Sequence, residues 1–323
     1  MAQHVAEAYN KLLKKNKSKY QIRLLDISSK KFADSEFNIT INENVRNADV
    51  YLFQALYDPT KEVSIQDNYI ELFITVRALK ENQAKSVTAI LPYLAYARQD
   101  KPTKFKRQAT TAKLLADLLK KAGVDHLVTW DPHSMQIKGF YDFPTEMLDS
   151  LSIFIDHFKR FKYKKDVIAV APDAGATKTI VPFSRALCIS FAIAEKYRPK
   201  PDDSEILSLT GDFKNKKTAL IIDDMVDTGA TFYHVIKELH KKGIKEIYGA
   251  CSHALLNHPA LDYFDEAYKK YGFKSLFTTN SIPQKKEVRQ RKYIHEISLA
   301  GIFANVINRI HYGKSLSAMF YKP

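Results

Sequence analysis

The amino-acid sequence predicts an α/β protein made of two tandem domains, each with a mostly parallel sheet flanked by helices. Short apolar runs that are rich in β-branched residues alternate with longer amphipathic stretches, and this alternation is typical of α/β folds. A chain of 323 residues with 45% hydrophobic residues can bury a sizeable core and is more often two domains than one. Residues 86–131 and 218–253 also share one order of strand, loop, glycine-terminated helix and strand.

The apolar runs define the expected strands, which are residues 49–56, 86–94, 126–131, 167–173, 218–224, 246–253 and 275–281. After the second of them, the segment ATTAKLLADLLKKAG has apolar residues on one helical face, and Gly123 can end this helix in a left-handed conformation. Because apolar strands that alternate with helices form parallel sheets covered on both faces, we expect this arrangement in both domains.

The turn-forming segment FPTEMLDS indicates a domain boundary near residue 150. We therefore expect a first domain at residues 1–149 and a second at residues 150–308. A C-terminal tail at residues 309–323 is expected to pack back on the first domain.

The formal net charge of +14 comes with lysine clusters at apparent turns and helix ends, the usual pattern of a solvated surface. The alternative is an attraction for anions, either nucleic acid or small phosphorylated substrates, but no basic motif is interleaved with aromatic residues. There is no run of roughly 18 apolar residues and no apolar core of a signal peptide at the N-terminus. We therefore expect a cytoplasmic protein that binds neither nucleic acid nor a membrane.

The two cysteines have no metal-ligand spacing. Cys188 and Cys251 lie in the apolar segments RALCISFA and YGACSHA. Both thiols are therefore expected to be reduced and buried.

The clearest functional signal is the acidic stretch IIDDMVDTGATF. Asp223 and Asp224 end an expected strand, and Asp227 precedes the turn 228–231, which leads into a helix. Ligands of open α/β sheets bind beyond the carboxyl ends of the strands, and a helix N-terminus attracts phosphate through unpaired N–H groups. Gly229 lets the backbone approach closely, whereas the carboxylates must accept hydrogen bonds from hydroxyls or hold a metal. A sugar phosphate with a vicinal diol meets both demands, although Asp227 as a helix cap beside a solvated strand end is the alternative.

Two further pairs of residues gain meaning beside such a site. Asp131 and His133 are two positions apart at an expected strand end, so their side chains share a face and suit the sparse protein coordination of Mg²⁺. Lys196 and Arg198 would alone be a solvated charge run. Next to a sugar phosphate they are suited to stabilise a transferred diphosphoryl group.

The acidic stretch resembles the ribose-5-phosphate loop shared by type I phosphoribosyltransferases and ribose-phosphate diphosphokinases, also called PRPP synthetases. This resemblance implies two phosphoribosyltransferase-like domains and a ribose 5-phosphate site made of Asp223, Asp224, Asp227, Thr228, Gly229, Ala230 and Thr231. A phosphoribosyltransferase needs one such domain, whereas a synthetase uses two in tandem.

Further segments favour the synthetase family, and the resemblance covers the chain from about residue 5 to 320. PYLAYARQDK is similar to the family's PYxxYARQD segment and KFADSEFNI to its FSDGE element, which implies an ATP site made of Phe32, Asp34, Ser35, Glu36, Arg98 and Gln99. VTWDPHSMQIKGFYDFP and VIAVAPDAGATKTI resemble its metal segments, which implies a Mg²⁺ site with His133, Asp131 and Asp173. EKYRPKPDDSE resembles its catalytic loop, with Lys196 and Arg198 at the two catalytic positions.

The resemblance implies an enzyme that transfers the β,γ-diphosphoryl group of Mg-ATP to the C1 hydroxyl of ribose 5-phosphate, giving PRPP and AMP. It also implies a homo-oligomer built from dimers, up to a hexamer. Two alternatives stay open: a regulatory relative without catalytic activity, and a phosphoribosyltransferase that consumes PRPP.

Overall fold

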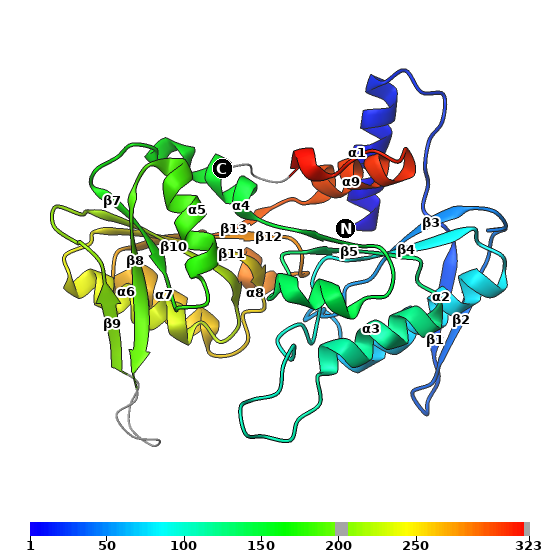
Figure 1. The fold of residues 1–323 in the computed structure, drawn as a ribbon, viewed down its shortest axis with the longest axis horizontal. Coiled ribbons are helices and arrows are strands. Elements are labelled where there is room, and N and C mark those ends of the chain that lie inside the picture. Colours follow the sequence, from blue (N-terminus) through cyan, green and yellow to red (C-terminus); the bar gives the residue numbers. More distant parts are fainter. Residues whose placement is uncertain (198–205, 320–323) are drawn as a thin grey trace. The chain divides into compact units, whose positions relative to one another are not determined.

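The computed structural model describes residues 1–197 and 206–319 and confirms the predicted α/β class (Figure 1). The chain forms two compact units. The first comprises residues 1–149, 281–283 and 298–319, and the second comprises residues 150–280 and 284–297. Each unit contains a mostly parallel sheet with helices packed against it.

The first unit is built on a parallel sheet in the order β3-β4-β5-β6, and β1 and β2 form a separate antiparallel hairpin. Its strands are β1 (Ile27–Lys31), β2 (Phe37–Ile41), β3 (Asp49–Phe53), β4 (Ser86–Leu91), β5 (His126–Trp130) and β6 (Thr145–Leu148). Its helices are α1 (Ala2–Lys15), α2 (Ile65–Glu81), α3 (Thr111–Ala122) and α9 (Ala300–His311), with 3₁₀ turns η1 (Met135–Phe140) and η3 (Ser317–Met319).

Local sequence explains where the helices of this unit begin and end. Ser64 and Asp67 form a capping box at the start of α2, in which each side chain accepts a hydrogen bond from the other residue's backbone N–H. Helix α3 ends at Gly123 with φ of 113°, as predicted, because the left-handed conformation is strained for residues with a side chain.

The second unit contains a larger sheet in the order β13-β12-β11-β10-β7-β8-β9, parallel except for β9, which runs antiparallel to β8. Its strands are β7 (Val167–Ala171), β8 (Ser190–Tyr197), β9 (Ile206–Thr210), β10 (Thr218–Val226), β11 (Glu246–Ala254), β12 (Phe273–Thr279) and β13 (Ile294–Ile297). Its helices are α4 (Leu151–Phe158), α5 (Thr177–Leu187), α6 (Ala230–Lys241), α7 (Ala260–Lys270) and α8 (Lys286–Arg289), with the 3₁₀ turn η2 (Lys159–Phe161).

Alternate residues of the central strands of this sheet point to opposite faces, and each face has its own core. Ile168 and Ile221 pack with side chains of α6 and α7, including Phe232 and Phe264. The residues next to them in sequence, such as Ala169 and Leu220, point to the opposite face and pack with side chains of α4 and α5. Burial on both faces explains why these strands read as continuous apolar runs.

All seven expected strands are present, with ends that differ by one to three residues from the expected ones. The sequence analysis missed β1, β2, β6, β8, β9 and β13. Most of these lie at or next to a sheet edge or in the small hairpin. An edge strand has fewer neighbours to bury it, so segments such as ISSKK in β1 and IHEI in β13 carry little apolar signal.

Helix α9 corrects the expected extent of the second domain. Residues 300–308 were assigned to the domain at residues 150–308, but α9 belongs to the first unit. It packs against α1, and the Phe303 ring contacts the rings of Phe53 and Trp130 at centroid distances of 5.9 and 6.4 Å. Residues 309–319 of the expected tail are also in the first unit.

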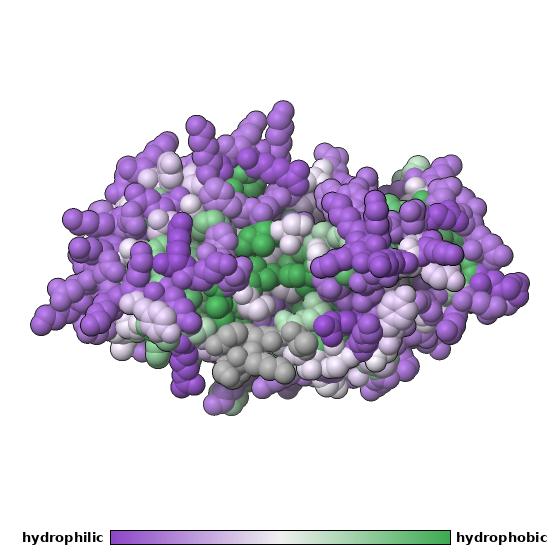
Figure 2. Space-filling model, turned by 90° about the horizontal axis from the view of Figure 1, so that it is seen from above, coloured by the Kyte–Doolittle hydropathy of each residue, from purple (hydrophilic) through white to green (hydrophobic). Residues whose placement is uncertain are grey.

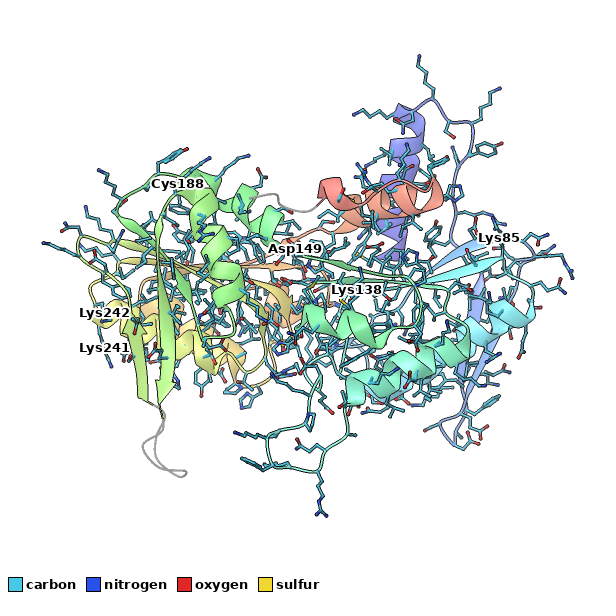
Figure 3. The ribbon with its side chains drawn as sticks, in the orientation of Figure 1. Lys85, Lys138, Asp149, Cys188, Lys241 and Lys242 are labelled. Atoms are coloured by element: carbon cyan, nitrogen blue, oxygen red, sulfur yellow. The ribbon has the colours of Figure 1, made fainter. Side chains whose placement is uncertain are left out.

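Lysines gather at the ends of helices, as the charge pattern indicated. Basic residues occupy the last turns of α1, α3, α6 and α7, where they favourably face the negative end of the helix dipole. Lys241 and Lys242, for example, extend from the end of α6 (Figure 3). Hydrophilic residues cover much of the face shown in Figure 2. In the part of the chain that the structure describes, no helix is long and apolar enough to cross a membrane.

The two cysteines differ in exposure, which corrects the expectation that both are buried. Cys251 lies in β11 and is fully buried, whereas Cys188 is exposed. Cys188 ends helix α5 with φ of 52°, so the chain turns there and leaves the thiol at the surface (Figure 3). An apolar neighbourhood in sequence did not reveal this helix end.

A thiol reagent is expected to label one cysteine of the native chain and two after denaturation. Burial raises the pKa of the Cys251 thiol to about 12, so its reactive thiolate is scarce at neutral pH and also inaccessible. The measurement is the absorbance change with an aromatic disulfide reagent at pH 7.5. The Cys188→Ser variant serves as the control and should show no rapid reaction, whereas rapid labelling of that variant would contradict the assignment.

Candidate active site

The acidic stretch lies at the point where the strand order of the second unit changes direction. The chain runs from β7 outward through β8 to β9, then returns to β10 on the other side of β7 and continues through β11 to β13. Such a switch point opens a crevice at the carboxyl ends of the two strands that flank it. Asp173 follows β7, and Asp223 and Asp224 lie near the end of β10. The fold therefore brings together carboxylates that are 50 residues apart in sequence.

Strand β10 extends further than expected. The sequence analysis ended it at Asp224, but it continues to Val226 because it keeps pairing with β11, where Asp223 is opposite Cys251. Its pairing with β7 stops at Ile221, opposite Val170. Asp223 and Asp224 therefore lie in the part of β10 that is paired with β11 but no longer with β7.

The carboxylates at this switch point act on one another. Burial first, then the charge and hydrogen bond of Asp224, and then the charge of Asp173 raise the pKa of Asp223 well above its ordinary value. The backbone N–H of Asp224 donates to Asp223 Oδ1 at 2.9 Å, and that of Ala176 donates to Asp173 Oδ1 at 3.1 Å. Hydroxyl donors or a cation would relieve this concentration of negative charge.

A magnesium ion suits this chemistry. Mg²⁺ binds oxygen ligands and usually combines one or two protein carboxylates with waters and substrate phosphates. Within residues 1–197 and 206–319, no group of three or more His, Cys, Asp or Glu side chains could hold a metal ion. The mutual repulsion of Asp223, Asp224 and Asp173 is nevertheless the kind of charge that a divalent cation neutralises.

The turn 227–231 connects β10 to α6 and has the features of a phosphate site. Gly229, not Asp227, occupies the N-cap of α6, so the alternative of Asp227 as the cap is wrong. Gly229 has φ of 75°, and a Cβ at this position would lie 3.2 Å from both Cα and Cβ of Ala260. The N–H groups at a helix N-terminus attract anions, so this position is suited to a phosphate.

The residues expected to bind ATP lie in the first unit on two structures. Phe32, Asp34, Ser35 and Glu36 form the loop of the β1–β2 hairpin, which is closed by a hydrogen bond from Phe32 N to Glu36 O at 2.8 Å. Within it Ser35 has φ of 77°, and Glu36 N donates to Asp34 Oδ1 at 3.1 Å. Phe32 is 41% exposed, and the Lys30 ammonium lies over its ring at 5.1 Å from the centroid.

Arg98 and Gln99 follow β4, and both are exposed. The hydroxyl of Thr111 donates to Gln99 Oε1 at 2.7 Å, and the backbone N–H of Ala112 donates to the Gln99 carbonyl at 3.3 Å. The start of α3 thus fixes the orientation of the Gln99 amide. The sequence analysis did not identify Thr111, because the pairing joins residues 12 positions apart across a loop.

The three expected metal ligands are divided between the units. Asp131 and His133 follow β5 in the first unit, with Asp131 at φ of 42° and His133 exposed. The backbone N–H of Asp131 donates to Leu148 O at 2.7 Å. Asp173 belongs to the second unit. Neither unit alone brings the expected set together.

The expected catalytic segment begins inside a strand. Lys196 lies in β8, where its backbone is opposite Leu207 of β9. Arg198 lies outside the described residues. Because β8 is the neighbour of β7, the strand with Lys196 belongs to the same sheet as Asp173 and the acidic stretch.

The fold and the residues at the switch point define a protein of the phosphoribosyltransferase-like α/β class. The sequence matches the N-terminal domain of ribose phosphate pyrophosphokinase over residues 3–123 and the phosphoribosyl synthetase-associated domain over residues 190–321. The chain belongs to the ribose-phosphate pyrophosphokinase family of enzymes.

Individual relatives span nearly the whole chain. The ribose-phosphate pyrophosphokinase of Clostridium tetani is 37% identical over 292 residues, which are 90% of this chain and 88% of the relative. That of Mycoplasma genitalium is 40% identical over 286 residues, covering 88% of this chain and 83% of the relative. The crystal structure of phosphoribosylpyrophosphate synthetase from Mycobacterium smegmatis has a TM-score of 0.83 at 28% identity and covers 96% of both chains.

Proposed function

We propose that the protein transfers the β,γ-diphosphoryl group of Mg-ATP to the C1 hydroxyl of ribose 5-phosphate, giving PRPP and AMP. The observation that carries this proposal is the pair Asp223 and Asp224 in the last part of β10, which ends at Val226 and is followed by the turn with Gly229 that begins α6. Vicinal hydroxyls of a sugar can donate to the carboxylates while its phosphate accepts from the N–H groups of the turn. Ribose 5-phosphate offers both groups on one molecule.

In the proposed reaction, the C1 oxygen of ribose 5-phosphate attacks the β-phosphorus of ATP and loses its proton to solvent. The bond between the β-phosphorus and the oxygen bridging to the α-phosphorus breaks, and AMP leaves. Asp223 and Asp224 orient the sugar, and the turn 227–231 holds its 5-phosphate. Lys196 and Arg198 stabilise the charge that develops on the phosphate oxygens, so catalysis depends mainly on positioning and electrostatics.

The remaining proposed roles concern ATP and its metal. Phe32, Asp34, Ser35, Glu36, Arg98 and Gln99 hold the nucleotide, and the Thr111 hydrogen bond keeps the Gln99 amide oriented. Asp131, His133 and Asp173 hold Mg²⁺, which supplies partial neutralisation of the phosphate charge when bound. The family resemblance also implies a cytoplasmic homo-oligomer built from dimers, up to a hexamer.

Purified protein supplied with ATP, Mg²⁺ and ribose 5-phosphate is expected to form AMP and PRPP in equal amounts. Chelation of Mg²⁺ should abolish both products, because the charge of the phosphates is then not neutralised. Chromatography of the nucleotides and a coupled assay of PRPP provide the measurements.

Reactions without ribose 5-phosphate are the control for simple ATP hydrolysis. Absence of AMP in the complete reaction would contradict the proposal. Consumption of PRPP that depends on an added base would instead identify a phosphoribosyltransferase. A regulatory relative would show neither reaction.

A further inference from the structure

The segment 255–260, which runs from the end of β11 to the first residue of α7, lies near the turn 227–231 of the second unit. The backbone N–H groups of Leu255 and Leu256 donate to the carbonyl of Val226 at 2.9 and 3.2 Å. At the other end of the segment, Ala260 lies close to Gly229, since a Cβ added to this glycine would be 3.2 Å from the Cα and Cβ of Ala260. The segment is therefore bonded to the residue before the turn and lies close to its glycine.

Between these contacts, a side-chain hydrogen bond joins the segment to the turn. Asn257 Nδ2 donates to Asp227 Oδ1 at 2.8 Å, across 30 residues of sequence. Asp227 is the first residue of the turn and directly follows Val226, the residue that accepts the two backbone hydrogen bonds. Hydrogen bonds to Val226 and to Asp227 thus connect the segment to the start of the turn.

A carboxylate at the entrance of a phosphate site repels the phosphate unless its charge is directed elsewhere. The Asn257–Asp227 hydrogen bond is exposed, so it acts by orienting the carboxylate and not by excluding water. An amide can satisfy a carboxylate oxygen without adding a positive charge that would compete for the phosphate. A turn that is already ordered also binds with a smaller loss of conformational entropy.

We infer that Asn257 is a positioning residue for the sugar phosphate: its hydrogen bond fixes the Asp227 carboxylate and holds the turn 227–231 ready for the 5-phosphate. This inference rests on the proposed function, since it takes ribose 5-phosphate as the ligand of the turn. Asn257 acts through Asp227 and is not assigned contact with the reacting atoms.

Two variants test the role of Asn257. Asn257→Ala removes the donor, and Asn257→Asp keeps the size of the side chain but places a second negative charge against Asp227. Loss of a hydrogen bond to a charged group should raise both the Kd and the KM for ribose 5-phosphate about tenfold in the first variant. The second should show at least the same loss. In both, kcat and the KM for ATP should change less than about twofold, since those interactions lie elsewhere.

The matched control is Asn305→Ala. Asn305 is an exposed asparagine of α9 whose amide donates to the Gly301 carbonyl of its own helix at 2.8 Å. Its replacement should leave the Kd for ribose 5-phosphate unchanged. Calorimetry measures the Kd, steady-state kinetics the KM and kcat, and circular dichroism the melting temperature of each variant.

Each outcome decides for or against the inference. An unchanged Kd for ribose 5-phosphate in both Asn257 variants overturns it. It is also overturned if kcat falls, the KM values for both substrates rise by similar factors and the melting temperature is lowered, because that pattern indicates a purely structural role. If the wild type binds ribose 5-phosphate but forms no AMP, the proposed function fails while the binding constants still judge Asn257. If the wild type does not bind ribose 5-phosphate, both fail.

Discussion

Replacement of Lys196 by alanine is expected to lower kcat by about 10²- to 10⁴-fold while the fold stays intact. Diphosphoryl transfer spreads negative charge over the phosphate oxygens in the transition state. A cation next to these oxygens stabilises the transition state more than the bound substrates and so lowers the barrier. The backbone pairing of residue 196 with Leu207 does not depend on the side chain, so the variant keeps this pairing. AMP release at saturating substrates gives kcat, and thermal unfolding reports the fold.

Lys274→Ala is the matched control for this prediction. Lys274 is an exposed lysine in β12 of the same sheet, so its replacement removes the same charge at a different strand. Its kcat should stay within about twofold of the wild type, since a surface charge away from the site contributes little. Near-normal turnover of Lys196→Ala would remove Lys196 from the proposed catalytic pair.

Gly229→Ala is expected to lower kcat/KM for ribose 5-phosphate by about 100-fold. A left-handed conformation costs an alanine roughly 1–2 kcal/mol, and the φ of Gly229 is 75°. The new Cβ would also lie 3.2 Å from Ala260 and 3.4 Å from Phe264, and such overpacking costs about 1–3 kcal/mol. A shift of the turn that relieves both would also move the N–H groups that are proposed to hold the phosphate.

The other end of the same helix offers a control that separates strain from contact. Gly243 has φ of 87°, but nothing lies within 4 Å of a Cβ placed there. Gly243→Ala should therefore lower the free energy of unfolding by about 1 kcal/mol without changing the KM for ribose 5-phosphate. Equal losses of kcat/KM in the two variants would contradict a specific role for Gly229, and both values come from initial rates at varied ribose 5-phosphate.

The central strands and the end of α3 were predictable because their signals are local. Residues 167–171 and 218–222 are apolar on both faces, and Gly123 stands where α3 must end. The same reasoning missed β13 and the β1–β2 hairpin, whose residues are largely polar or exposed. It also placed Cys188 in the core, since an apolar neighbourhood does not reveal on which side of a helix end a residue lies.

The candidate site divides in the same way. The acidic stretch can be recognised from nine consecutive residues, 223–231, because a carboxylate pair near a strand end and a glycine turn follow one another along the chain. The contacts that hold this stretch join distant segments. Besides burial, the charge of Asp173, which follows β7, raises the pKa of Asp223 in β10. Asn257 donates a hydrogen bond to Asp227 although the two residues are 30 positions apart.

The α/β class and the enzyme family could be predicted from the sequence alone, because hydrophobic periodicity, glycine positions and contiguous motifs are properties of neighbouring residues. The membership of α9 in the first unit, the switch point between β7 and β10, and the support of the turn by residues 255–260 came from folding. These features depend on which segments bury each other's apolar surface and satisfy each other's backbone groups, and that pairing involves residues too far apart for any local pattern to encode.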